Sequence, residues 1–365
     1  VEYASQEAVY TKMFEELDEA IATLGRNTTL SSDAWSRYDG VYYGNIAQWL
    51  KYANSLKLRM AMRLTEVKPE LAQAKAAEAI AGGVITSNAD NAAMHAAENR
   101  TTLIYNDWGD HRVGADILCY MTGYNDPRME KMFLPNDVGD YVGIRIGIDV
   151  AGKSTAMAKY SNMIVESTTP YLWFNAAEAT FLRAEYELRW GSEETAKTLY
   201  EQAVQLSFEE RGASGAEAYL ADASKKPAPY TDPLGNYSAS ARSEITVPWE
   251  TASDAGDAEA VWERNLERII TQKWIAIFPL GVEAWSEHRR TGYPKLLPVP
   301  TDKSGGSVNV EQGARRLPYP VEEYQQNNTN LQTAIQTLDA EQQNGDRTGD
   351  VMGTRVWWDC KPYNK

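Results

Sequence analysis

The chain has little of what metal, redox and nucleotide chemistry usually require. Its 365 residues include only two cysteines, Cys119 and Cys360, and three histidines. Neither residue type stands at the spacing of a metal site, and nothing in the sequence supports a disulfide between the two cysteines. The sequence also lacks a phosphate-binding glycine loop, a GxSxG nucleophile motif and an HExxH zinc motif. We therefore expect no cofactor, no metal ion and no catalytic class that depends on these motifs.

Long hydrophobic runs and basic clusters are missing as well. No segment approaches the roughly 20 apolar residues of a transmembrane helix, and no Lys/Arg run is long enough to follow a phosphate backbone. With a formal net charge of −15, the surface should repel both nucleic acid and anionic lipid headgroups. The sequence begins at Val1 without methionine or a leader, so we expect a processed or trimmed chain, with any signal peptide or lipid-bearing cysteine upstream.

Tryptophan and tyrosine, by contrast, are abundant. The chain has 11 Trp and 21 Tyr against 6 Phe, and these rings combine an apolar face with a polar tip. Many of them fall in polar, glycine-punctuated loops, such as IYNDWGDHR at residues 104–112. Aromatic faces beside amides and carboxylates are how proteins hold sugars. The sequence therefore predicts a ligand-binding surface that is built from loops.

The loop around Trp108 is the first candidate for that surface, because loops concentrate binding residues. It supplies Tyr105, Asn106, Trp108 and Arg112. The predicted ligand-binding set is completed by further loop aromatics: Tyr124, Tyr230 and Trp249, followed by Tyr38, Tyr42 and Tyr237. Packing in the core is the alternative for each of these rings.

Hydrophobic residues recur at helical spacing in several segments, some of which are joined by short links that make helical hairpins. These segments are residues 5–25, 45–67, 69–83, 171–191, 192–212 and 258–278. The stretch AKTLYEQA carries a tetratricopeptide-like pattern at Ala196, Tyr200 and Ala203, opposite the small Ala184. Residues 84–170 read as irregular, with one helical piece near 114–121, and the segments 216–255 and 301–365 read as loops and turns. We predict a mostly α fold in which tetratricopeptide-like helix pairs carry a loop-rich, ligand-facing part.

Two acidic features could carry chemistry. A pair of carboxylates facing each other across a cleft would suit glycoside hydrolysis, and Glu178 and Glu185 share one predicted helix face. We favour the alternative that they are solvated or paired with Arg183 and Arg189. The stretch NDVGD, residues 136–140, offers oxygen ligands for structural Ca²⁺ but lacks the full calcium-loop pattern, so we favour a polar turn.

The segment at residues 272–300 resembles an active site, because histidine, arginines and carboxylates meet there among aromatic rings. It contains Glu283, Glu287, His288, Arg289 and Arg290. No nucleophile or metal ligand accompanies the histidine, and carboxylate–arginine bonds on a short helix are suited to fixing a corner of a fold. We predict a structural role for this segment.

Six motifs occur in an order that resembles the SusD/RagB family. They are WLKYANSLKLRMAMRL, AGGVITSNADNA, GYNDPRM, a block running from ERIITQKWIA to RRTGYPK, RRLPYPVEEY and the closing VWWD. The resemblance covers nearly the whole chain, from about Val1 to Trp358. It implies a single SusD-like domain over residues 1–365 with an α-α superhelical fold. It also implies that the N-terminal part of the family, with its lipidated cysteine and first helices, is missing.

The resemblance further implies a non-catalytic, lipid-anchored protein on the outer face of the bacterial outer membrane. Such a protein binds a nutrient, usually an oligosaccharide, and delivers it to a SusC-like TonB-dependent barrel. A peptide ligand is the alternative within the family. An all-α glycoside hydrolase and a helical scaffold that binds only protein are alternatives from other classes. Because the family has no fixed ligand motif, the resemblance assigns no site residue.

Overall fold

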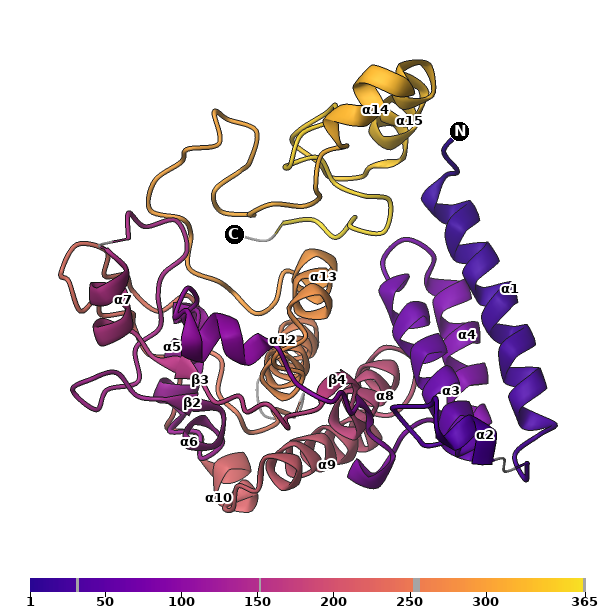
Figure 1. Cartoon of the computed structure of the whole chain (residues 1–365), viewed down its shortest axis with the longest axis horizontal. Helices are drawn as coiled ribbons and strands as arrows, with labels where there is room; N and C mark the ends of the chain where they lie inside the picture. The colour runs from indigo at the N-terminus through magenta and orange to yellow at the C-terminus, as the bar shows by residue number, and fades with distance from the viewer. Residues whose placement is uncertain (31–32, 151, 252–256, 364–365) are drawn as a thin grey trace.

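The computed structural model describes residues 1–30, 33–150, 152–251 and 257–363, and it is mostly helical (Figure 1). An arc of helices runs along one side of the molecule, and two further helices lie inside that arc. The arc consists of α1 (Gln6–Gly25), α3 (Ile46–Arg63), α4 (Pro69–Gly82), α8 (Ala176–Trp190), α9 (Glu193–Arg211) and α10 (Ala216–Ala221). The inner helices are α12 (Ala258–Ala276) and α13 (Gly281–Thr291). This arrangement confirms the predicted mostly α fold with paired helices.

Shorter elements complete the fold. The helical ones are α2 (Asp33–Ser36), η1 (Asn88–Asp90), η2 (Leu103–Asp107), α5 (Ala115–Tyr124), α6 (Met129–Met132) and α7 (Lys153–Lys159), with α14 (Val321–Gln326) and α15 (Asn328–Glu341) near the end of the chain. Helices α5, α6 and α7 lie away from α1, α3 and α4, whereas α2 lies beside α3 (Figure 1). Strand β1 (Ala92–Met94) pairs antiparallel with β4 (Tyr171–Phe174), and β2 (Phe133–Leu134) pairs antiparallel with β3 (Asn162–Met163). These elements anchor the long loops that the sequence places between the helix pairs.

The helices begin where the sequence provides capping groups. Ser5 accepts a hydrogen bond from the Ala8 amide at 3.2 Å, and Asn45 accepts one from the Gln48 amide at 3.2 Å. Helix α4 begins with Pro69, whose fixed φ suits the first turn. The tetratricopeptide-like pattern is confirmed as a packing pattern, because its small and aromatic members are fully buried between α8 and α9: Ala184, Ala196, Tyr200 and Ala203.

Several secondary-structure predictions were wrong: α6 (Met129–Met132), α7 (Lys153–Lys159) and α10 (Ala216–Ala221) lie in segments read as irregular or as loops, and two larger differences concern residues 171–175 and the closing segment. The helix expected from residue 171 begins at Ala176, because Asn175 caps it by accepting from the Glu178 amide at 2.9 Å. The aromatic residues before that cap form β4 instead. The closing segment, predicted as turns, contains α14 and α15. The polar composition of α15 hid its apolar stripe at Leu331, Ala334 and Leu338, whose spacing is helical.

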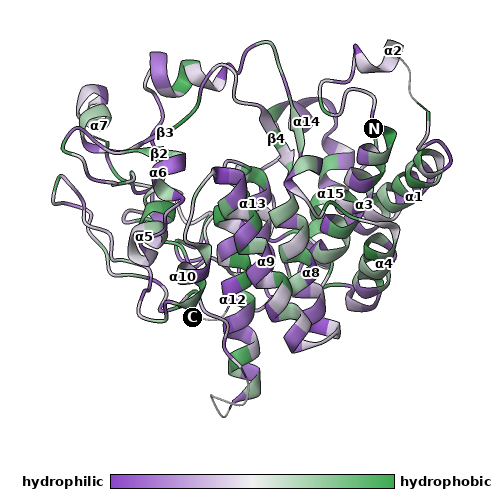
Figure 2. Ribbon diagram, turned by 90° about the horizontal axis from the view of Figure 1, so that it is seen from below, coloured by the Kyte–Doolittle hydropathy of each residue, from purple (hydrophilic) through white to green (hydrophobic). Residues whose placement is uncertain are grey.

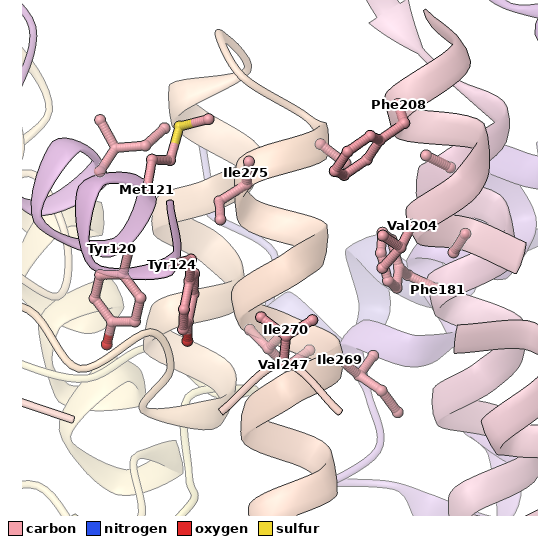
Figure 3. Packing of buried hydrophobic residues seen from close by; sticks show 14 of the residues in the cluster. Tyr120, Met121, Tyr124, Phe181, Val204, Phe208, Val247, Ile269, Ile270 and Ile275 are labelled. Atoms are coloured by element: carbon pink, nitrogen blue, oxygen red, sulfur yellow. The ribbon is translucent and has the colours of Figure 1, made fainter. Parts of the chain in front are cut away.

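The main hydrophobic core forms around α12 (Figure 3). Tyr120 and Tyr124 of α5 lie on one side of this helix, while Phe181 of α8 and Phe208 of α9 lie on the other. Ile269 of α12 is fully buried between the two sides. A second core unites α3, α4 and the closing tryptophans, Trp357 and Trp358. The two cores together fix the arc to the loop-rich side.

An ionic cluster is buried where α3, α8, α12 and α13 meet. Its members are Arg59, Arg63, Glu178, Glu185, Lys273, Glu283, Glu287 and Arg290. Arg290 is its centre, with Nη1 2.6 Å from Glu185 Oε1 and Nη2 2.7 Å from Glu287 Oε2. The contacts of Lys273, Glu283, Glu287 and Arg290 fit the structural role predicted for residues 272–300. Helix α13 joins the arc to the core through charge pairs.

Glu185, Glu283 and Glu287 of the ionic cluster keep a lowered pKa despite their burial. Burial alone would raise the pKa of Glu287, but the nearby charges of Arg290, Lys273 and Arg63 hold that pKa well below its ordinary value. Burial likewise opposes ionisation of Glu185, whose pKa is lowered by Arg290 and Arg189. Charge pairs of this kind add little when whole but cost several kcal/mol when one partner is removed.

Two further observations concern the chain as a whole. Among the described helices, none is both long and apolar enough to cross a bilayer. Cys119 and Cys360 are both free thiols. Burial raises the pKa of Cys119 to about 12 and that of Cys360 to about 11, so both are unreactive thiols at neutral pH.

Candidate functional site

A hollow lined by exposed aromatic side chains lies between the loop that precedes α3 and the β1–β4 strand pair. We call it the aromatic hollow, and it has a volume of about 580 Å³. Its lining residues are Trp35, Tyr38, Asp39, Gly40, Val41, Trp49, Met94 and Trp173. Figure 2 shows α2, which carries Trp35, on the same side of the molecule as β4, which carries Trp173. The hollow is within the size range of small-ligand sites.

The rings at the rim of the aromatic hollow are unusually open to solvent. Trp35 is 62% exposed, Tyr38 is 90% exposed and Trp173 is 37% exposed. Large aromatic side chains normally bury most of their surface. Three exposed rings around one concavity therefore indicate a surface that contacts another molecule.

Asp39 fixes the loop that carries these rings. Its Oδ1 accepts hydrogen bonds from the amides of Val41 and Tyr42 at 2.9 and 3.1 Å. Its Oδ2 accepts from the Gly44 amide at 2.8 Å and from the Trp49 indole at 2.7 Å. Burial would raise the pKa of Asp39, but these donors hold it below its ordinary value. The carboxylate is thus an internal anchor for the loop rather than a free acid.

A chain of ring contacts supports the floor of the hollow. The Trp49 ring meets Tyr42 at 5.3 Å and Tyr52 at 5.7 Å between centroids, both edge to face. Tyr52 in turn lies 6.3 Å from Trp173. The Trp173 carbonyl accepts a hydrogen bond from Arg59 Nη2 at 3.1 Å. Because Arg59 belongs to the ionic cluster, this hydrogen bond connects the backbone of the hollow to that cluster.

Replacing Asp39 with alanine should loosen the loop of the aromatic hollow. The change removes four hydrogen bonds from partly buried donors, so we expect a loss of about 1–3 kcal/mol in the free energy of unfolding. Amide hydrogen exchange should also accelerate at residues 41–44. Asp39→Asn, which keeps one acceptor oxygen, should show a smaller effect on both measurements. Unchanged exchange in the alanine variant would contradict the anchoring role.

The loop at residues 104–112, which was the first candidate for ligand contact, has one exposed aromatic ring. Trp108 is 55% exposed, just after η2. Tyr105 packs partly against the main core with its ring 5.8 Å from His111. Asn106 donates to the Val165 carbonyl at 3.0 Å, and Arg112 Nη1 donates to the His111 carbonyl at 2.6 Å. Ligand contact through this loop stays a prediction, with Trp108 as its accessible residue.

The other predicted rings lie mostly in the core. Tyr124 is 3% exposed and donates to the Ile245 carbonyl at 3.1 Å, and Tyr230 is also 3% exposed. Trp249 packs 5.6 Å from the buried ring of Tyr200. The rings of Tyr124 and Tyr230 are therefore closed to a ligand. Both are packed in the interior, which is the alternative that the sequence left open for them.

Tyr42 and Tyr237, which were also predicted to contact ligand, are buried and partly buried. Tyr42 is 5% exposed and donates to the Asp90 carbonyl at 2.8 Å. Tyr237 is partly buried, and its carbonyl accepts from Arg145 at 2.7 Å. In the described part of the chain, Tyr38 is the one predicted ring that lines the aromatic hollow.

Sequence reasoning did not include three rings of the hollow in the predicted site. Trp35 stands three residues before Tyr38 in the same polar, glycine-punctuated loop, so the same signal applied to both. Trp49 falls on the apolar stripe of a helix and looked like core. Trp173 was assigned to a helix, and only its pairing in β4 brings it to the surface.

The carboxylates considered for glycoside hydrolysis are already occupied. Glu178 is fully buried and binds Arg59 through both oxygens, at 2.7 and 2.6 Å. Glu185 pairs with Arg189, as predicted, and also with Arg290. The alternative that these two carboxylates are solvated was wrong, because cationic residues of α3 and α13 cover this side of α8.

Residues 136–140, which were considered as calcium ligands, form a turn. The side-chain oxygen of Asn136 accepts from the amides of Val138 and Asp140 at 3.1 and 2.9 Å, which confirms the predicted polar turn. Within the described ranges, no group of three or more His, Cys, Asp or Glu side chains is placed to hold a metal ion.

The fold and the hollow define a class: a mostly helical protein with paired helices, whose loops present an exposed aromatic surface. The SusD-like family model, described as SusD and RagB outer membrane lipoprotein, matches residues 1–359. The chain belongs to this family, whose members are generally non-catalytic binding proteins. No functionally curated protein matches the sequence.

Solved structures support this assignment. A SusD homologue from Bacteroides thetaiotaomicron is 50% identical, with a TM-score of 0.92 over 99% of this chain and 76% of its own. A homologue from Bacteroides ovatus is 42% identical, with a TM-score of 0.89 over 99% and 75% of the two chains. A chitin-binding SusD homologue from Flavobacterium johnsoniae is 40% identical, with a TM-score of 0.89 over 99% and 74%.

Proposed function

We propose that the protein captures an oligosaccharide in the aromatic hollow and delivers it to a SusC-like TonB-dependent barrel. The observation that carries the proposal is the group of exposed rings, Trp35, Tyr38 and Trp173, around one preformed concavity. A pyranose ring presents an apolar face of C–H groups, which stacks on such rings, while its hydroxyl groups bond to polar neighbours. The chitin-binding relative supports a glycan as the ligand class.

The proposed setting is the outer face of the outer membrane, with a lipid anchor outside the described chain. The family description supports this setting, since it names an outer membrane lipoprotein. The partner barrel is proposed from the family resemblance alone.

Binding without catalysis is part of the proposal. Glycoside hydrolysis needs one carboxylate that donates a proton and a second that stays available near the sugar. Glu178 and Glu185 are held in buried ion pairs, and Asp39 is bonded to four donors within its own loop. These groups position rings and helices, and none of the three is free to transfer a proton.

Affinity electrophoresis tests the proposal directly. The protein should migrate more slowly in native gels that contain a soluble glycan, with chitin oligosaccharides, starch and β-glucans as separate gels. Isothermal titration with the retarding glycan should give modest affinity, because each stacked ring contributes about 1 kcal/mol and binding must offset lost motion. Release of sugar products would contradict the non-catalytic part. Capture of peptides without any glycan would favour the peptide alternative.

Trp108→Ala tests whether a second loop contacts the same glycan. The segment before this loop is tied to β4 and its vicinity, because the Arg100 amide donates to the Tyr171 hydroxyl at 2.8 Å and Asn99 donates to the Thr169 carbonyl at 2.8 Å. Loss of one stacked ring should weaken binding by up to about tenfold. The melting temperature should change little, since the ring is exposed. Unchanged affinity would remove this loop from the site.

A further inference from the structure

A second concavity, which we call the cationic cavity, lies at the C-terminal end of α13. Its volume is about 620 Å³, and none of its lining residues lines the aromatic hollow. Its lining includes six cationic side chains: Arg242, Arg289, Lys295, Arg315, Arg355 and Lys361. Only two carboxylates, Glu263 and Glu311, accompany them in the lining. Such an excess of positive charge stands out in a chain whose net charge is −15.

Two of the cations are neutralised within the lining. Lys361 Nζ lies 2.5 Å from Glu263, and Arg242 Nη2 lies 2.7 Å from Glu311. Lys295 is weakly paired by comparison, since its nearest carboxylate, Glu267, is 3.8 Å away. The side chain of Lys295 is 46% exposed, so it stands at the entrance. The uncompensated charge therefore lies at the entrance and among the buried arginines.

Two of the buried arginines, Arg315 and Arg355, share a single carboxylate. Asp359 Oδ1 lies 3.0 Å from Arg315 Nη2 and 3.4 Å from Arg355 Nη1. Arg289 forms no ion pair with any carboxylate of the described residues. Three guanidinium groups thus face one acid, and burying an unpaired charge is costly unless something compensates it.

Arg289 is the group that most clearly lacks an anion. Its guanidinium lies over two indole rings, 3.6 Å from the centroid of Trp285 and 4.6 Å from that of Trp358. Burial and the neighbouring charges of Arg63 and Arg315 lower its pKa to about 10. The N–H groups of a guanidinium lie in its plane, so its edges make the hydrogen bonds. Those edges are suited to a planar carboxylate.

Several donors at the cavity have no acceptor. A guanidinium carries five N–H groups, and Arg289 uses three, toward Trp285 O, Ser286 Oγ and Arg315 O. The Nε of the buried Arg355 has no hydrogen-bond partner among the described residues. Unsatisfied donors of this kind are rare in native interiors and call for a partner.

The wall also provides a neutral acceptor. His288 Nδ1 lies 3.0 Å from the Pro294 carbonyl, which can only accept, so that nitrogen carries the proton. Burial and the charge of Arg315 lower the pKa of His288 to about 4. At neutral pH the ring is therefore uncharged, and its Nε2 is an acceptor.

We propose that the cationic cavity binds a small organic anion through a carboxylate group. The edge of Arg289 supplies donors, the guanidinium of Arg355 adds positive charge to the lining, and Lys295 attracts the anion at the entrance. Leu296, Tyr293 and Pro362 in the same lining offer apolar surface for the organic part, which inorganic phosphate would not use. The cavity volume is within the range of small-molecule sites. This site is separate from the proposed glycan site.

Isothermal titration at constant ionic strength tests this proposal, with D-glucuronate as the probe and D-glucuronamide as its uncharged isostere. Glucuronate should bind measurably below about 10 mM, whereas glucuronamide and inorganic phosphate should bind at least about fivefold more weakly. Equal binding of the charged and neutral probes would overturn the proposal, as would equal or tighter binding of phosphate. The absence of glucuronate binding would also overturn it.

Two charge reversals locate the site. Lys295→Glu should weaken glucuronate binding by roughly fivefold or more, because it places a negative charge at the entrance. Lys197→Glu on α9 is the matched control, since its side chain is 45% exposed and does not line the cavity; it should leave affinity unchanged. The Trp35→Ala/Trp173→Ala protein should also retain glucuronate binding. Equal effects of the two reversals, or loss of binding in the tryptophan variant, would assign the probe to another place.

Discussion

Replacing Arg290 with methionine should lower the free energy of unfolding by about 3–5 kcal/mol. Arg290 is fully buried and bonds to both oxygens of Glu185, at 2.6 and 2.7 Å, as well as to both oxygens of Glu287. Methionine fills part of the volume but leaves two carboxylates without their main cation. The expected loss is a large part of the 5–15 kcal/mol that stabilises a typical domain. Urea unfolding followed by circular dichroism would measure it.

The matched control makes the same substitution at an exposed ion pair. Arg264 also lies on a helix and pairs with Glu250, but its side chain is 40% exposed. Arg264→Met should cost less than about 1 kcal/mol, as exposed pairs do. Similar losses in the two variants would mean that burial of the charges is not what makes Arg290 important.

The pH dependence separates charge burial from a simple packing defect. In the native protein, Arg290 holds the pKa values of Glu185 and Glu287 below their ordinary value, so their stabilising effect persists until the pH falls below about 4.3. Without Arg290, burial should raise both pKa values, and the folded variant should gain stability as the pH falls from 7 toward 4.5. The difference between the two proteins should therefore shrink on acidification. A packing defect would give a difference that does not depend on pH.

The Trp35→Ala/Trp173→Ala double variant should lose most of its glycan affinity. Both rings border the aromatic hollow, on α2 and on β4. Truncating aromatic residues at the centre of a binding surface commonly costs 1–2 kcal/mol or more each. We expect a dissociation constant raised by roughly 30-fold or more. At the modest affinity of the wild type, retardation in the glycan gel should disappear.

The melting temperature of the double variant and a control substitution of another aromatic residue show whether the effect is specific to the hollow. Because the two rings are 62% and 37% exposed, the melting temperature of the double variant should stay close to that of the wild type. Tyr324→Ala removes another partly exposed ring, on α14, and should leave retardation intact. Retained retardation in a folded double variant would place the glycan elsewhere and remove the main support for the proposed function.

The fold was largely predictable because its helices carry strong local signals. Ser5, Asn45 and Pro69 mark helix starts, and the apolar stripes between them have helical spacing. The strand at Tyr171 was not predictable in this way, since a run of aromatic residues suits either a helix or a strand. Its partner β1 is nearly 80 positions earlier, and only tertiary packing pairs the two.

The candidate site was predictable in kind but not in its members. Polar loops rich in tyrosine and tryptophan pointed to an aromatic surface, and Tyr38 lines it. Tyr124 carries the same local signal but is buried, because its hydroxyl finds an acceptor in the Ile245 carbonyl. A single sequence does not tell an exposed ring from a buried ring with a satisfied hydroxyl. The distant contact between the loop before α3 and β4 decides which rings meet.

The hydrogen bond that joins the ionic cluster to the backbone of the aromatic hollow affects which residues of the protein can change during evolution. Arg59 bonds Glu178 on one side and the Trp173 carbonyl on the other, so a buried charge network holds the backbone beneath the aromatic hollow. The Trp35 and Tyr38 side chains project from that support and contribute little to the interior. Mutations at these tips change the chemistry offered to a ligand while leaving the scaffold nearly unaffected. Substitutions at the rim should therefore alter this surface without first requiring repair of the fold.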